Sequence, residues 1–136
     1  IHYQDRSGHS QYNGDGIQLA IKTPEMLGFW EMGFSRSNEG VSDVYIWSSP
    51  EGFSSTAGQT IILTTRRTAR QTIYHAEIPV DKFGLKNVAS SGMLYNFIIN
   101  DNDGEKREGW MQYTEGLGGG KDPNKFKYIF FKTRTK

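Results

Sequence analysis

The residues best suited to chemistry lie in a loop rich in acids and amides, 100–110, which follows the apolar run 94–99. The loop carries four consecutive Asn and Asp side chains, then a glycine, a charged cluster and Trp110. Calcium prefers hard oxygen ligands of this kind, so we expect a structural calcium ion with Asp101 and Asp103 among its ligands. The alternative is an ordinary turn that its own Asn and Asp side chains cap.

Other sequence patterns give little support for catalysis. His2, His9 and His75 show no metal-ligand spacing. No Gly-x-Ser-x-Gly motif occurs, and no phosphate-binding glycine loop precedes a helix. Acidic pairs in the 100–110 loop would serve as acid and base only if they faced one cleft. We therefore expect a protein that is not an enzyme.

Binding at a shallow surface is better supported. Sugar recognition needs flat aromatic faces, together with amides, carboxylates and guanidinium groups that pair with vicinal hydroxyls. Aromatic residues make up 13% of the chain. Tyr12 precedes a turn and Trp47 precedes a Ser-Ser-Pro loop, so we keep both rings as candidates for stacking on a sugar. Trp110 lies on an expected strand, where we predict that it packs into the core.

Short strands must position these residues. Alternating polarity and residues of high β propensity mark eight segments, 16–22, 30–36, 44–48, 60–67, 71–79, 93–100, 109–114 and 126–133. In the fifth segment, Tyr74, Ala76 and Ile78 point to one side, and the residues between them point to the other. Eight such strands, separated by glycine-rich turns, predict an all-β fold, an antiparallel β-sandwich.

Length and composition set further bounds. A chain of 136 residues predicts a single domain, 1–136. The absence of cysteine excludes disulfides, cysteine-based zinc sites and thiol catalysis. With a net charge of +1 and scattered basic residues, we expect no nucleic-acid partner, and no apolar run is long enough for a membrane span. Because the chain begins at Ile1, we expect a processed or excised piece of a longer protein.

Four segments carry a family resemblance, and they occur in the family's order. They are the Asn-Gly-Asp-Gly strand start in 13–21, Tyr-His-Ala-Glu-Ile-Pro at 74–79, the segment 96–109 that matches an Asn/Asp loop followed by Arg and Trp, and Lys-Asp-Pro-Asn-Lys-Phe at 121–126. Together they resemble the carbohydrate-binding modules of family 9 and the wider group of DOMON-like β-sandwiches. The resemblance implies a sandwich of jelly-roll or immunoglobulin-like type, with structural calcium in some members.

The resemblance also implies a function. Such modules are noncatalytic, bind polysaccharide or oligosaccharide, and target secreted or cell-surface bacterial enzymes to their substrate. Tyr12 stands where the family often has a clamping Trp, and Gln18 stands where a polar side chain reaches the sugar. Glycines 118–120 replace the second clamping ring, so we expect a single ring, or Trp47, to stack on the sugar. The expected carbohydrate-binding residues are Tyr12, Gln18, Arg36, Trp47 and Lys121.

Two alternatives remain open. The family module normally begins several strands earlier, so this chain is either completed by an upstream segment or second chain, or is a fragment of a glycoside hydrolase or lyase whose catalytic part lies elsewhere. Some DOMON-like sandwiches instead hold haem b between Met and His ligands for electron transfer. Three histidines and four methionines make such a pair available here, and a colourless purified protein would exclude it.

Overall fold

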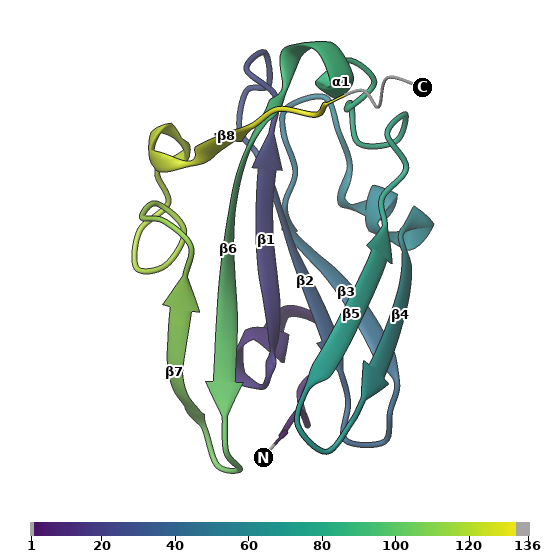
Figure 1. The fold of residues 1–136 in the computed structure, drawn as a ribbon, viewed down its shortest axis with the longest axis vertical. Coiled ribbons are helices and arrows are strands. Elements are labelled where there is room, and N and C mark those ends of the chain that lie inside the picture. The colour runs from purple at the N-terminus through teal and green to yellow at the C-terminus, as the bar shows by residue number, and fades with distance from the viewer. Residues whose placement is uncertain (1, 133–136) are drawn as a thin grey trace.

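The protein is built mainly from antiparallel β-strands (Figure 1). A computed structural model describes residues 2–132. Within that range the strands are β1 (Gly16–Lys22), β2 (Trp30–Arg36), β3 (Ser42–Ser48), β4 (Ile62–Arg67), β5 (Thr72–Glu77), β6 (Met93–Asn102), β7 (Arg107–Gln112) and β8 (Lys127–Ile129). The helical turns are η1 (Gly8–Asn13), η2 (Ser55–Thr60), α1 (Val88–Ser91) and η3 (Pro123–Lys125).

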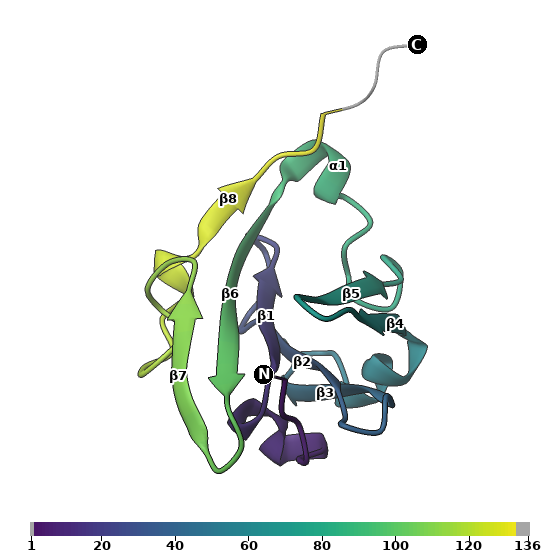
Figure 2. The same cartoon turned by 60° about the horizontal axis from the view of Figure 1, so that its bottom comes forward.

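The strands form two sheets. The large sheet has the order β3-β2-β1-β6-β7, with β8 paired to the start of β6, and every pair in it is antiparallel. β4 and β5 form a separate hairpin, which faces the β2–β3 part of the large sheet (Figure 2). β1 is therefore central, and its alternate side chains point to opposite faces of the sheet.

All eight predicted strands are present, and the antiparallel, mainly β prediction is confirmed. β1 and β2 have the predicted bounds, whereas β4 begins later than predicted because residues 55–60 form η2. β8 is shorter than the predicted segment 126–133, whose last residue lies outside the described range. The sandwich of family 9 type stays a prediction, because the second sheet described here has only two strands.

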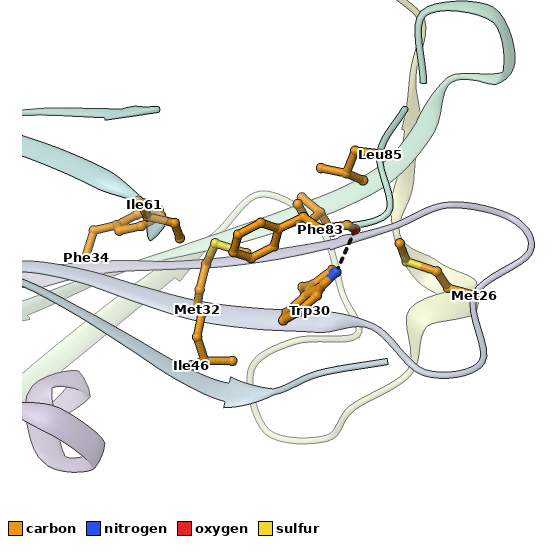
Figure 3. Packing of buried hydrophobic residues seen from close by; sticks show 9 residues of the cluster. Met26, Trp30, Met32, Phe34, Ile46, Ile61, Phe83 and Leu85 are labelled. Atoms are coloured by element: carbon orange, nitrogen blue, oxygen red, sulfur yellow. Dashed lines mark hydrogen bonds between the residues drawn. The ribbon is translucent and has the colours of Figure 1, made fainter. Parts of the chain in front are cut away.

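The main hydrophobic core lies between the hairpin and the large sheet (Figure 3). Trp30 and Phe83 are both fully buried, with ring centroids 4.4 Å apart, and Trp30 Nε1 donates a hydrogen bond to the Phe83 carbonyl oxygen at 3.1 Å. Burial of such large rings contributes strongly to folding, and the hydrogen bond satisfies the indole N–H. Tyr74 and Ala76 pack against this core from β5, which confirms the predicted alternation.

The same face of the sheet is less well covered over β6 and β7. Ile99, Met111 and Tyr113 are 42%, 66% and 51% exposed. Tyr113 stacks on Tyr95 with ring centroids 5.2 Å apart. This face therefore carries apolar side chains from β3 to β7. The opposite face carries polar residues such as Gln18 and Asn100 beside a second apolar cluster of Ala20, Ile98, Leu117 and Phe126. In residues 2–132, no helix combines the length and the apolar character that a membrane crossing requires.

Candidate functional site

A pocket of about 450 Å³ opens on the face of the large sheet that points away from the core. This volume lies within the range of about 300–1,000 Å³ that is common for small-ligand sites. The central strands contribute Gln18, Glu31 and Ile98. The side formed by η1 and β3 contributes His9, Tyr12 and Trp47. The side formed by β7 and the loop after it contributes Arg107, Trp110, Leu117, Gly118, Gly119 and Lys121.

Gln18 lies at the base of the pocket. On β1 it pairs with Gly33 of β2 and Ile98 of β6, so neighbouring strands surround it. Its side chain is only 7% exposed, and its amide makes no hydrogen bond with any other described residue. Among the described residues, Ser35 Oγ is the one fully buried side-chain polar atom without a partner, so the Gln18 amide keeps access to the pocket. Gln18 is thus poised to bond a polar group in the pocket.

Glycine at position 33 lets Trp47 lie close to the sheet. A Cβ there would overlap the Trp47 ring and the Gln11 amide, so no larger residue fits without movement. Trp47 Nε1 donates to the His9 carbonyl oxygen at 3.0 Å, which joins β3 to η1. The Tyr12 ring meets the Trp47 ring edge-on, with centroids 6.4 Å apart. These contacts hold two aromatic rings on one side of the pocket.

Trp110 supplies an aromatic ring on the other side, and our prediction that it packs into the core is wrong. It is 41% exposed and lines the pocket. Trp110 pairs with Asn100 across β6–β7, so it points to the same face as Gln18. A Cβ on Gly118 would overlap the Trp110 ring, so this glycine permits the loop to close over the indole.

Three charged side chains line the pocket. Lys121 Nζ lies 2.8 Å from Glu31 Oε1, and it also donates to the Leu117 carbonyl oxygen at 2.8 Å. Arg107 donates to Asn100 Oδ1 at 3.2 Å, and its guanidinium carbon lies 5.5 Å from the centroid of the Tyr12 ring. The Lys121 ammonium is therefore neutralised, while Arg107 makes no ion pair with a described residue.

Four of the five predicted carbohydrate-binding residues meet at this pocket: Tyr12, Gln18, Trp47 and Lys121. Arg36 does not join them. Its guanidinium donates to the Gly40 carbonyl oxygen at 2.9 Å and contacts Thr65 Oγ1 at 3.4 Å, near the edge of β4. The side chain is thus occupied in joining a turn to the hairpin.

The predicted calcium ligands lie away from the pocket. Asp101 pairs with Gly109 and is exposed, while Asp103 lies in the turn between β6 and β7. No group of three or more acidic, histidine or cysteine side chains suited to a metal is present in the described part of the chain. Calcium at these two residues stays a prediction.

Asn102 ties this turn to the rest of the protein. Its Oδ1 accepts from the Gly104 N–H at 2.7 Å, and its Nδ2 donates to the Asn13 carbonyl oxygen at 2.7 Å. Its backbone N–H donates to Asp15 Oδ1 at 2.8 Å. These hydrogen bonds form a turn that its own Asn side chain caps, which is the alternative to a calcium site that the sequence left open.

The histidines and methionines available for the haem alternative are spread over the molecule. His9 lines the pocket, whereas His75 is exposed on β5. Met32 is fully buried in the core, and Met111 is exposed on the apolar face. Haem binding remains a hypothesis.

Of the polar and aromatic residues that line the pocket, sequence reasoning did not assign four to the site: His9, Glu31, Arg107 and Trp110. The face to which Trp110 points follows from its place in the alternation of β7. That face can be assigned only when the register of β7 on β6 is known. Compared with models of protein families, with curated proteins and with solved structures, the chain gives no match.

Proposed function

We propose that the protein is a noncatalytic carbohydrate-binding module and that the pocket around Gln18 holds a sugar ring of a polysaccharide or oligosaccharide. The observation that carries the proposal is the Gln18 amide, which lies at the base of the pocket, keeps access to it and has no partner among the described residues. A planar amide matches two neighbouring hydroxyl groups, because it offers a donor and an acceptor side by side.

Aromatic side chains complete the match to a sugar. Trp47 and Trp110 line opposite sides of the pocket, and Tyr12 adds a third ring. The C–H face of a pyranose stacks on such rings, while its hydroxyl groups reach the amide and the charged groups. Trp110 takes the part of the second ring, which the resemblance to family 9 modules assigns to the segment now occupied by glycines 118–120.

The charges of the pocket support the noncatalytic part of the proposal. Of the described residues that line the pocket, Glu31 supplies the one carboxylate, and it is held in an ion pair with Lys121. Sugar hydrolysis by the common mechanisms uses two carboxyl groups on either side of the scissile bond. By the resemblance, we also propose a family 9 type of sandwich, serving a secreted or cell-surface bacterial enzyme.

Isothermal titration tests the proposal against a panel of soluble polysaccharides and oligosaccharides, with calcium present. We expect at least one glycan to bind. Gln18→Leu keeps the approximate size of the side chain but removes its hydrogen bonds, so we expect binding at least about tenfold weaker. The matched control is Gln71→Leu, an exposed glutamine at the β4–β5 turn. A folded sample that binds no glycan contradicts the proposal.

Calcium is a separate part of the proposal. If Asp101 and Asp103 hold a structural ion, calcium raises the unfolding temperature above its value in a chelator, because a ligand that binds only the folded state stabilises it. The double variant Asp101→Asn with Asp103→Asn then removes this increase. Equal unfolding temperatures in calcium and in chelator contradict a calcium site.

A further inference from the structure

We infer that the sugar held by this pocket carries a carboxylate group, as a uronic acid does, and that Arg107 binds it. This inference rests on the proposed function, because it names the class of sugar for the same pocket. It goes further in one respect, since neither stacking nor the Gln18 amide distinguishes an acidic sugar from a neutral one.

The charges of the pocket are unequal. Its described lining contains the cations Arg107 and Lys121 and the single carboxylate of Glu31, which leaves an excess of one positive charge with histidine neutral. The carboxylate is already paired, at 2.8 Å from the Lys121 ammonium. The unmatched charge therefore belongs to Arg107, which makes no ion pair with another described residue.

Arg107 is also held in place before any ligand binds. One terminal nitrogen donates to Asn100 Oδ1 at 3.2 Å, and Asn100 itself is only 3% exposed. The guanidinium carbon lies 5.5 Å from the Tyr12 ring centroid, at a distance suited to cation–π attraction. These two contacts restrict the side chain, so less conformational entropy is lost when a ligand binds.

The remaining N–H groups of the guanidinium suit a carboxylate. Arginine presents five donors in a planar fork that matches the two oxygens of a carboxylate, and such bonds are about twice as strong as neutral ones. Asn100 uses one donor. Because the side chain lines the pocket together with Gln18 and Trp110, one sugar can stack, bond the amide and place its acid group on Arg107.

The test compares matched pairs of oligosaccharides by isothermal titration in low salt. One pair is an oligogalacturonate and its methyl ester, and another is a glucuronate-bearing xylo-oligosaccharide and its unsubstituted form. We expect the acidic member of at least one pair to bind about 10- to 100-fold more tightly, as a charge-assisted hydrogen bond predicts. The advantage should fall in higher salt, because the ion pair is partly exposed.

Arg107→Gln should reduce the advantage of the acid to within about twofold, measured as the ratio of the acidic and neutral affinities in that same variant. Arg107→Lys should keep part of the acidic sugar's advantage in affinity, because the charge remains but the planar guanidinium is lost. The matched control is Arg66→Gln, an exposed arginine on β4, which should keep the full difference. Thermal unfolding of each variant checks its fold, and the neutral sugar checks its pocket.

The outcomes separate the inference from the proposed function. Equal affinities for acidic and neutral partners overturn the inference and leave carbohydrate binding intact. A sulfated oligosaccharide that binds more tightly than every carboxylated one also overturns it, because the anion is then not a carboxylate. Failure of all glycans to bind removes the proposed function itself.

Discussion

Lys121 and Glu31, ninety residues apart in the chain, form an ion pair across the pocket with a nitrogen–oxygen distance of 2.8 Å. The same ammonium donates a second hydrogen bond to the Leu117 carbonyl oxygen, also at 2.8 Å. The loop after β7 is thereby joined to β2. The pocket depends on this contact, because the loop carries its glycine-lined side.

Removing Lys121 should lower the unfolding free energy more than removing Glu31. The Glu31 side chain is 7% exposed, whereas that of Lys121 is 47% exposed. Lys121→Met leaves a buried carboxylate unpaired, which we expect to cost about 3 kcal/mol of unfolding free energy. Glu31→Gln leaves an ammonium that can turn to water, and about 1 kcal/mol is expected. Urea unfolding measures both, and equal costs would contradict the assigned burial.

Trp110 should matter for binding more than for folding. It is 41% exposed, so Trp110→Ala should lower stability only modestly, while loss of a stacking ring should weaken glycan binding by about tenfold. Titration with the best glycan and thermal unfolding separate the two effects. Tyr128→Ala is the control, because Tyr128 is 51% exposed on β8 and does not line the pocket. Unchanged affinity in the Trp110 variant would remove this ring from the site.

Gly33 should be intolerant of a single added methyl group. Gly33→Ala would push the new Cβ against Trp47 and Gln11, and overpacking of this kind costs about 1–3 kcal/mol. It should also displace the Trp47 ring and weaken glycan binding. Gly109→Ala is the matched strand control, since a Cβ there meets nothing within 4 Å. Urea unfolding and intrinsic tryptophan fluorescence report both changes, and two variants of equal stability would refute the close packing.

Asn102 should be the most sensitive polar residue of the β6–β7 turn. The side chain accepts from Gly104 and donates to Asn13, and Asn102 is only 2% exposed. Asn102→Ala leaves both backbone groups without these partners, so we expect a loss of about 2–3 kcal/mol. Asn124→Ala, at an exposed position in η3, should change stability by less than about 0.5 kcal/mol. Similar losses in chemical denaturation would argue against the assigned role.

Tyr74 should make the protein sensitive to alkaline pH. Burial raises the pKa of its phenol from 10.0 to about 12, and the nearby Asp15 carboxylate adds to the increase. The folded state therefore favours the neutral phenol. This contribution is fully present below pH 10 and is lost as the pH rises toward 12, because the unfolded state releases the proton first.

By pH 11 the wild type should lose about 1 kcal/mol through Tyr74. Tyr74→Phe cannot ionise, so it should lack this part of the loss and gain relative stability between pH 8 and pH 11. Urea unfolding at the two pH values measures the difference. Parallel losses in the two proteins would show that the phenol ionises equally in both states.

The sequence predicted the strands well because their signals are local. Period-two alternation in 73–78 and the turn residues between strands follow from neighbouring residues alone. Gln18 was identified only through the resemblance to family 9 modules, which match it to a polar position on this strand. Glycine and proline marked most of the strand ends. The start of β4 was predicted too early, because no local signal separated it from η2.

The tertiary structure alone decided which of these residues share a site. Trp110 faces the pocket because β7 pairs with β6 in the register that sets it opposite Asn100, and a shift by one residue would turn it to the other face. Arg36 was excluded for a related reason, since its partners Gly40 and Thr65 come from a turn and from the hairpin. The residue types and strands were thus readable from the sequence, while the pocket arises from long-range pairing, which no local pattern encodes.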